Sequence, residues 1–484
     1  MPTTIVWLRQ DLRLADHPAL CFAARRGAVV PVFIDSPEEE GAWPTGGARK
    51  WWLHQSLAAL RDALEKKGSR LIFRQGPALE TLLQIAQDAD ADTVVWHRRY
   101  EPAAIERDKQ VKRGLADAGL DAKSFNGHLL FEPWELETKQ GRPYQVFTPF
   151  HRAMQQLPEP DSPLDPPKKL EPPAKWPRQT PLEDLGLMPE IKWYQGMANT
   201  WTPGEQGGAE QLSGFVNDPV ADYLETRDTP SEQGTSRLSP YLHHGEVSVR
   251  QAYHAARKRT TGNAGAALKH NAYGYLRQLA WRDFGYHLLY HFPQTPDQPL
   301  REKYADFPWI DVEYEDGHAA FAAWKKGKTG YPIVDAGMRE LWHTGWMHNR
   351  VRMVVASFLV KHLLIDWREG AKWFWDTLVD ADLANNTLGW QWAGGCGADA
   401  APYFRIFNPM LQGEKFDCEG VYVRKWCPEL KDVPAKYTHK PWEAPHLVLQ
   451  QASVTLGEGY PEPIVDHKEA RERALDALSE ISGH

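Results

Sequence analysis

The sequence predicts an α/β fold followed by an all-helical fold, and two observations lead to this class. The first 130 or so residues alternate short apolar runs with helical patterns, an order typical of a doubly wound parallel sheet. After about residue 201, long helical patterns follow one another and strand signals almost disappear. We therefore expect an α/β domain over residues 1–130, a linker over 131–200 and an all-α domain over 201–484.

The N-terminal elements are expected in a regular order. The run TIVWL is a strand, and Pro18 stands at the start of a helix that ends at Gly27. The elements expected after it are the strand AVVPVFI, the helix WWLHQSLAALRDALEKKG, the strand RLIFR, the helix ALETLLQIAQDA and the strand TVVWH. The turn after the first strand, RQDLRLADH, lacks the GxGxxG fingerprint, so we expect a Rossmann-like sheet without dinucleotide-binding chemistry.

The linker and the helical half carry separate signals. Residues 157–189 are rich in proline, which favours a semi-rigid segment along the surface. The stretch VDAGMRELWHTGWMHNRVRMVVASFLVKHLL predicts two helices that are interrupted near Gly345.

The composition is that of a globular protein with an excess of tryptophan. Hydrophobic residues make up 42% and charged residues 25% of 484 residues, and most of the 21 tryptophans lie in the second half. No apolar run approaches the ~18 residues that span a bilayer. The four cysteines lack CxxC spacing, so we expect reduced thiols in a cytoplasmic protein. The net charge of -8 argues weakly against bulk nucleic-acid affinity, but it leaves room for a local basic face.

Three segments of the helical half suggest a binding site. The run from Gly234 to Ser239 combines hydroxyl groups and an arginine before a helix, which favours an anion site, although a plain helix N-cap explains it too. Arg350 and Arg352 point roughly 200° apart on a helix. An inward arginine there needs a buried partner, for which Asp380 and Asp382 are candidates, and a surface ion-pair network is the alternative.

On another helix, Gln278, Trp281 and Arg282 lie on nearby faces, which suits base stacking and phosphate contact as well as ordinary helix packing. His287 and His291 are four residues apart, but no glutamate or third ligand accompanies them, so we expect no metal site.

The segment NNTLGWQWAGGCGADAAPYFRIFNP places Trp390 and Trp392 beside glycines and alanines. A packed core would fill such space with bulky side chains, so we expect a flat molecule to lie against the indoles.

These segments together resemble the DNA photolyase and cryptochrome family over nearly the whole chain, from VWLRQDLRLADHPAL to YPEPIVDHKEARERAL. The most specific motifs are TGYPIVDAGMRELWHTGWMHNRVRM and DADLANNTLGWQWAGGCGADAAPYFRIFNP, which look most like bacterial class I photolyases for cyclobutane pyrimidine dimers. The resemblance implies FAD in the helical domain and light-driven repair of UV-damaged DNA by electron transfer.

The resemblance also implies roles for matching residues. The residues expected to hold FAD are Tyr223, Thr235, Ser236, Arg237, Leu238, Ser239, Tyr275, Trp346, Arg352, Asp380, Ala381, Asp382 and Asn386. Among these, Arg352 would pair with Asp380, and Asn386 would face flavin N5. The residues expected to receive DNA and the flipped dimer are Arg227, Gln278, Trp281, Arg282, Asn349, Arg350, Met353 and Trp392.

An electron-transfer chain is implied from Trp390 through Trp367 to the surface. Trp309 in the motif FPW is the expected terminal donor, with Tyr314 as the alternative because the spacing back from Trp324 falls there.

Two features of the sequence depart from the family pattern, at Gln278 and at the pair Ala103 and Ala104. Class I dimer photolyases usually carry glutamate where this chain has Gln278, and an amide cannot supply a proton, so we expect weakened or altered repair. Glutamine here is also found in six-four photolyases and animal cryptochromes. Ala103 and Ala104 stand where polar residues that contact a folate would be expected. The identity of a second antenna chromophore therefore stays open between a deazaflavin, another chromophore and none.

Three hypotheses follow for the function. The first is a light-dependent DNA repair enzyme, a deoxyribodipyrimidine photo-lyase. We expect it to act as a monomer and to have no membrane partner. The second is a cryptochrome-like blue-light photoreceptor, and the third is a DNA-binding protein with a vestigial flavin pocket. The absence of a long C-terminal tail favours the enzyme.

Overall fold

The computed structural model describes residues 1–261 and 264–481. Its contacts divide the chain into two compact units. The first unit comprises residues 1–221, 236–293 and 379–382, and the second comprises 222–235, 294–378 and 383–484. The predicted boundaries at residues 130 and 200 differ from this division, since several helices beyond residue 201 belong to the first unit.

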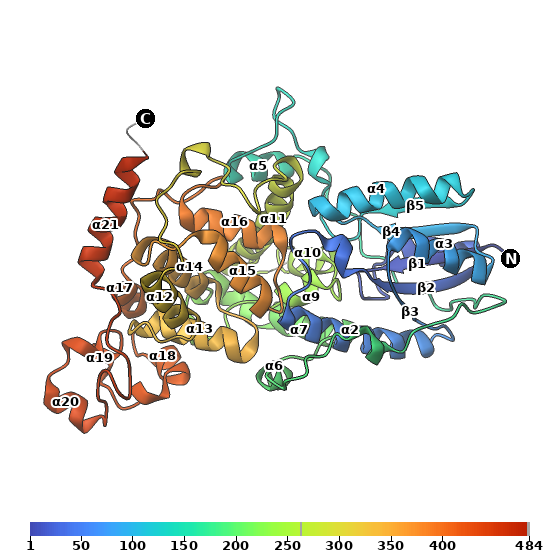
Figure 1. The fold of residues 1–484 in the computed structure, drawn as a ribbon. Helices are drawn as coiled ribbons and strands as arrows, with labels where there is room; N and C mark the ends of the chain where they lie inside the picture. Colours follow the sequence, from blue (N-terminus) through green and yellow to red (C-terminus); the bar gives the residue numbers. More distant parts are fainter. Residues whose placement is uncertain (262–263, 482–484) are drawn as a thin grey trace. The chain divides into compact units, whose positions relative to one another are not determined.

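The first unit contains a parallel sheet of five strands in the order β3-β2-β1-β4-β5 (Figure 1). The strands are β1 (Thr3–Leu8), β2 (Ala28–Asp35), β3 (Ile72–Gln75), β4 (Thr93–His97) and β5 (Asp121–Phe125). The first four coincide with the predicted strands. The fifth was not predicted, because DAKSF is an edge strand whose side chains are only partly buried and which lacks an apolar run.

Helices cover both faces of the sheet, as the doubly wound prediction requires. Val6 and Leu8 of β1 share one apolar cluster with α1 (Pro18–Arg26) and α2 (Gly47–Glu65). On the other face, Ile5 and Trp7 share a second cluster with α3 (Ala78–Ala89) and α4 (Pro102–Asp117). Alternate residues of one strand thus belong to two separate apolar cores, because successive side chains in a strand point to opposite faces.

The rest of the first unit is helical apart from the proline-rich segment. Its helices are α5 (Phe147–Met154), α6 (Gln195–Thr200), α7 (Glu205–Asn217), α9 (Ser239–His243), α10 (Val249–Lys258) and α11 (Ala266–His291). The proline-rich segment has little regular structure, and its Leu170, Leu182 and Leu185 join the core on the α1 and α2 face. It therefore packs on the sheet unit along part of its length.

The described residues of the second unit form helices and no named strand. The helices are α8 (Tyr223–Thr226), α12 (Glu315–Lys325), α13 (Pro332–Thr344), α14 (Asn349–Ser357), a π-helix (Phe358–His362), α15 (Trp367–Thr377), α16 (Leu383–Gly394), α17 (Pro409–Phe416), α18 (Val421–Trp426), α19 (Ala435–Thr438), α20 (His446–Gln451) and α21 (His467–Glu480). The predicted interruption is confirmed, since α13 ends at Gly345, whose φ of 66° favours glycine.

The sequence expectations about cysteines and membrane spans can be compared with the same structure. All four cysteines are free thiols, of which Cys418 is exposed. Within the described residues, no helix has both the length and the apolar character that crossing a bilayer would require.

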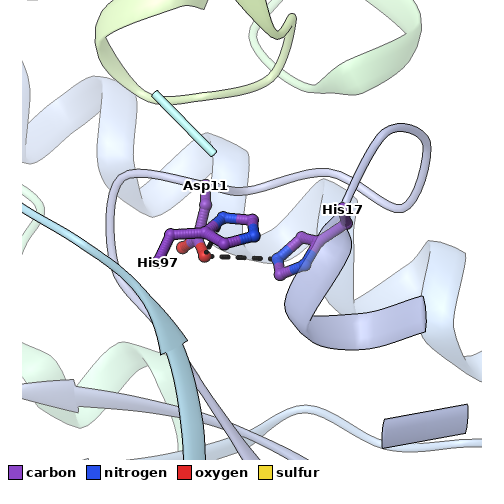
Figure 2. Close-up of side chains that lie close together, drawn as sticks. All are labelled: Asp11, His17 and His97. Atoms are coloured by element: carbon purple, nitrogen blue, oxygen red, sulfur yellow. Dashed lines mark ion pairs between the residues drawn. The ribbon is translucent and has the colours of Figure 1, made fainter. Parts of the chain in front are cut away.

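A buried cluster joins the ends of β1 and β4 in the first unit. Asp11 follows β1, His97 ends β4, and His17 caps α1 (Figure 2). Oδ2 of Asp11 lies 3.2 Å from Nε2 of His17 and 3.0 Å from Nδ1 of His97. Three ligand atoms this close raise the question of a metal ion.

The other nitrogen of each imidazole argues against a metal in this cluster. Nδ1 of His17 accepts a hydrogen bond from the backbone N–H of Leu20, and Nε2 of His97 accepts one from Ala19. Each proton must therefore sit on the nitrogen that faces Asp11. Metal binding would need the opposite tautomers, so the arrangement suits two neutral histidines that donate to one carboxylate.

The cluster predicts a loss of stability in weak acid. Burial and the neighbouring His17 lower the pKa of His97 to about 3, whereas the unfolded chain binds this proton near pH 6.5. The stabilisation is complete above pH 6.5 and is lost as the pH falls toward 3, about 2 kcal/mol of it between pH 7 and pH 5. Urea unfolding followed by far-UV circular dichroism should show that His97→Asn is less stable at pH 7 and loses less stability between pH 7 and pH 5.

The exposed His270 on α11 provides the matched control, since His270→Asn should keep the wild-type pH dependence. Equal pH dependence in wild type and His97→Asn would contradict the assignment.

Candidate functional site

The predicted anion segment turns sharply before α9. Arg237 has a φ of 50°, in the left-handed region, and Leu238 after it is right-handed. Such an alternation of backbone hand lets successive N–H groups converge on an anion. The N-cap of α9 is Leu238, which makes no capping side-chain bond, and Oγ of Ser236 accepts a 3.4 Å hydrogen bond from the backbone N–H of Leu238.

The side chains of this segment are held within the first unit. The guanidinium of Arg237 lies 4.4 Å from the ring of Trp201, and the carbonyl of Ser236 accepts a hydrogen bond from Gln211. Leu238 is buried, whereas Ser239 is exposed. Thr235 and the buried Tyr223 belong to the second unit.

Asp382 anchors a buried polar network in the first unit. It accepts a hydrogen bond from the hydroxyl of Tyr286 and lies 3.5 Å from Nδ1 of His243. Burial alone would raise the pKa of Asp382, but the hydrogen bond from His243 and the positive charge of Arg282 hold it far below its usual range. The side chain therefore stays ionised in the interior. Asp380 and Ala381 beside it are also buried, as is Tyr275 on α11.

Arg282, which is expected from the family resemblance to receive DNA, does not lie at the surface. It is buried, and its guanidinium donates 2.7 Å hydrogen bonds to the carbonyl and toward Nε2 of His128. The neighbouring Trp281 stacks on Phe147 at 3.7 Å between ring centres, and Gln278 is half-buried on the same helix. Both Arg282 and Trp281 therefore make helix-packing contacts, and a role of Trp281 toward DNA stays a prediction.

His287 and His291 on the same helix both have hydrogen-bond partners. Nδ1 of His287 lies 3.1 Å and Nε2 of His291 lies 3.2 Å from the carbonyl oxygen of Pro133. A backbone acceptor, rather than a metal ion, accounts for their spacing.

The second unit brings Arg227, Arg350 and Lys415 together. Arg350 donates to Asp228 over 2.8 Å, and Arg227 lies 3.9 Å from the other oxygen of that carboxylate. Arg350 and Lys415 lie 4.4 and 5.0 Å from the ring of Phe416. The predicted surface ion-pair network is therefore present at Arg350.

Arg352 points differently from Arg350, as their spacing predicts. Its Nε donates over 2.8 Å to the carbonyl of Met347, and its guanidinium lies 5.9 Å from the ring of the buried Trp346. The pairing with Asp380 stays a prediction. Asn349 and Met353 share one face of α14, with 3.9 Å between the amide nitrogen and the sulfur.

Trp390 is buried against α15 in the second unit. A Cβ added at Gly370 would lie 2.1 Å from Cη2 of Trp390, so only glycine allows this approach. One turn earlier on α15, Trp367 lies near Gly394, which is one turn after Trp390 on α16. The two helices thus place Trp367 and Trp390 along one shared interface.

Trp390 also contacts two aromatic rings that sequence reasoning did not select. Its ring centre lies 6.2 Å from Trp324 and 5.0 Å from Phe374. Trp324 is fully buried and donates its indole N–H to the carbonyl of Val355. The signal available in the sequence was the abundance of tryptophan, which does not say which indoles touch.

The two candidates for the terminal electron donor differ in exposure. Trp309 is half-buried, and its ring lies 4.2 Å from Phe307, whereas Tyr314 is 73% exposed at the start of α12. A stacked pair, Trp342 on α13 and Trp373 on α15, also reaches the surface, with 6.0 Å and 4° between the rings.

Trp392 and Asn386 on α16 remain partly accessible. Trp392 is half-buried, and its ring lies 6.4 Å from Phe407. The amide nitrogen of Asn386 donates over 3.0 Å to the carbonyl of Ala371 on α15, its one hydrogen-bond partner among the described residues. The amide oxygen and second hydrogen of Asn386 therefore remain available to a ligand.

Comparisons with known proteins agree with this arrangement. The profile of the FAD binding domain of DNA photolyase matches residues 275–480, and the DNA photolyase profile matches residues 4–171. A deoxyribodipyrimidine photo-lyase of Agrobacterium fabrum is 50% identical over 99% of this chain and 98% of its own length. Cryptochrome-1 of Arabidopsis thaliana is 40% identical over 99% of this chain and 70% of its own length.

Two solved structures have the same fold. A bacterial class III photolyase from Agrobacterium tumefaciens has a TM-score of 0.95 and 48% identity, covering 100% of this chain and 98% of that one. An archaeal photolyase from Sulfolobus tokodaii, solved with two FAD molecules, has a TM-score of 0.80 and 30% identity, covering 99% and 100%.

The sequence expectation was class I, whereas the 48% identical structure is described as a class III photolyase. The family itself is confirmed by similarity over the full length of both chains. This chain belongs to the DNA photolyase and cryptochrome family.

Proposed function

We propose that this chain is a light-dependent DNA repair enzyme, a deoxyribodipyrimidine photo-lyase that splits cyclobutane pyrimidine dimers. The observation that carries the proposal is the 50% identity, over almost the full length, to a deoxyribodipyrimidine photo-lyase. The match to an FAD binding domain supplies the cofactor. When bound in its reduced form, FAD supplies the electron that light excites and that opens the cyclobutane ring.

The chain offers groups that suit a flavin dinucleotide in each unit. In the first unit, the turn at Arg237 and Leu238 suits the phosphates, and the FAD residues proposed there are Ser236, Arg237, Leu238, Ser239, Tyr275, Asp380, Ala381 and Asp382. In the second unit they are Tyr223, Thr235, Trp346, Arg352 and Asn386.

Asn386 has a definite task within this proposal. Its bond to Ala371 fixes the rotation of the amide, so the remaining oxygen and hydrogen point in set directions. A fixed amide can favour one protonation state of a ring nitrogen without itself transferring a proton. We assign Asn386 this orienting role toward flavin N5.

The proposed DNA-binding residues fall into two classes. Arg227, Arg350 and Lys415 supply positive charge for phosphates, and Trp392 supplies an accessible flat ring for a flipped dimer. Asn349 and Met353 line the same helix face, while Gln278 and Trp281 lie on α11. We assign Arg282 a supporting role instead, because its guanidinium is buried and donates a hydrogen bond to the carbonyl of His128.

The proposal also covers the cellular location, the oligomeric state, the DNA partner and a second chromophore. We propose a cytoplasmic monomer that binds UV-damaged DNA. A second antenna chromophore is supported by the relative that was solved with two FAD molecules, and its chemical identity stays open between a deazaflavin and another chromophore.

A cryptochrome-like photoreceptor is the second candidate function. Gln278 favours it, as does the 40% identity to a plant cryptochrome. A six-four photolyase shares the glutamine. Illumination of the reduced holoprotein with separate cyclobutane and six-four oligonucleotides distinguishes these functions, since a photoreceptor leaves both lesions unchanged.

The first prediction concerns repair and Gln278. Under blue light, wild type should restore a defined thymine dimer, and Gln278→Glu should raise the yield roughly twofold or more, because a carboxyl group can donate a proton to the lesion carbonyl whereas an amide cannot. The yield is measured as the recovery of thymine absorbance per absorbed photon, because splitting restores the C5=C6 double bonds that the dimer lacks. Equal dimer content in lit and dark samples would reject the enzyme, and an unchanged yield in Gln278→Glu would reject only the role of Gln278.

The second prediction concerns photoreduction of the flavin. Trp390→Phe should slow the appearance of reduced flavin at least roughly tenfold, because phenylalanine is much harder to oxidise than tryptophan. Transient absorption of Trp367→Phe, Trp309→Phe and Tyr314→Phe then orders the later steps, with the exposed Trp134→Phe as the control. Wild-type kinetics in Trp390→Phe would contradict the route.

The third prediction concerns the basic residues of the second unit. Arg350→Ala should weaken binding of damaged and undamaged DNA alike and should reduce the slope of log K against log[salt] by about 1. Lys372→Ala on α15 removes an equal charge at an exposed position that pairs with Glu369, and it should leave the slope unchanged. Identical slopes for wild type and Arg350→Ala would place the DNA elsewhere.

A further inference from the structure

The segment between α16 and α17, residues 399–407, presents two exposed side chains on a buried base. Phe404 is 65% exposed and Arg405 is exposed, whereas Tyr403 before them is 2% exposed. At the end of this 399–407 loop, the ring of Phe407 lies 6.4 Å from Trp392. The loop therefore ends close to the indole that we assign to the lesion, shortly after its two exposed side chains.

Two buried groups of the π-helix hold this loop. Nζ of Lys361 donates over 3.0 Å to the carbonyl of Arg405, and the ammonium lies 5.4 Å from the ring of Tyr403. The hydroxyl of Tyr403 in turn donates to the carbonyl of Val360. Consecutive residues of one π-helix thus contact the loop on both sides of Phe404, and π-helical turns are frequent at functional sites.

Lys361 is an unusual choice for a purely structural contact. It is 2% exposed, and in the described part of the chain it forms no ion pair, so a carbonyl oxygen and an aromatic ring must balance its charge. Burial and the charge of Arg405 lower the pKa of Lys361 to about 8. A buried ammonium without a carboxylate partner costs stability, which suggests that it serves the geometry of the loop.

We propose that Lys361 is a positioning residue that holds the 399–407 loop in the conformation that binds lesion-containing DNA. The inference rests on the proposed function, because it takes DNA as the ligand beside Trp392. An exposed phenyl ring and a guanidinium suit the bases and phosphates of an opened duplex. When these groups are ordered before binding, the complex forms without the entropic cost of fixing the loop.

The test compares Lys361→Met with wild type on a thymine-dimer oligonucleotide. Methionine keeps an unbranched side chain but loses the charge and the donor. The Kd for dimer DNA should rise roughly tenfold, the size expected for one charge-assisted hydrogen bond. Flavin content and the repair yield at saturating DNA should stay within about twofold of wild type, a split that separates positioning from chemistry.

Limited trypsin digestion measures the loop directly. Cleavage after Arg405 should be faster in Lys361→Met than in wild type, and dimer DNA should protect wild type more strongly. Lys372→Met removes a lysine charge from an exposed site in the same unit and should change neither Kd nor cleavage by more than about twofold.

Tyr403→Phe removes the other tether while keeping the ring and Lys361, so it decides the question if Lys361→Met does not fold. Its Kd should rise in the same direction by a smaller factor. An unchanged Kd in the folded Lys361→Met variant, or in Tyr403→Phe if only that one folds, overturns the inference while wild type still repairs dimers. Failure of wild type to bind or repair dimers would instead overturn the proposed function.

Discussion

The close approach of α15 to the indole of Trp390 is the constraint on which the second unit depends. A side chain larger than hydrogen at Gly370 would overlap the indole. Trp324 and Phe374 contact the same indole, and Trp367 lies along the same helix interface, near Gly394. Rings held this closely exchange electrons readily, and a repair enzyme that must regain its reduced flavin gains from such packing.

Each unit carries buried charge whose partners are fixed in position. Asp11 accepts from two neutral histidines. Asp382 accepts from a tyrosine hydroxyl and lies close to His243 and the positive charge of Arg282, so both carboxylates stay ionised in the interior. Lys361 is the counterpart of opposite sign, with a carbonyl and a ring as its partners. Charges balanced in this way depend on geometry more than ion pairs between flexible side chains do, so they fix the position of the segments that carry them.

The fold was largely predictable because its signals are local. Apolar runs identified the strands from β1 to β4, and Gly345 marked the break between α13 and α14. The edge strand β5 was not predicted, because its side chains are partly exposed and it has no apolar run. Family motifs also selected Trp390 and Asn386, whose roles toward the flavin stay proposals.

Partners of polar residues could not be predicted in the same way. Periodicity places Arg282 on a helix face. It does not reveal that the hydrogen-bond acceptor of its guanidinium is His128, more than 150 residues earlier. The contact between Trp324 and Trp390 is likewise a product of tertiary packing. The division of the chain into two units also depends on contacts distant in sequence, since residues 379–382 belong to the first unit.

The stacked pair of Trp342 and Trp373 has a practical consequence for studies of folding. Two parallel indoles 6.0 Å apart couple their electronic transitions, so the pair should give the near-UV circular dichroism spectrum a distinctive signal. Both tryptophans lie in the second unit, where they pack α13 against α15. Since the pair needs both helices in place, its signal reports the integrity of α13 and α15 separately from the melting of the sheet.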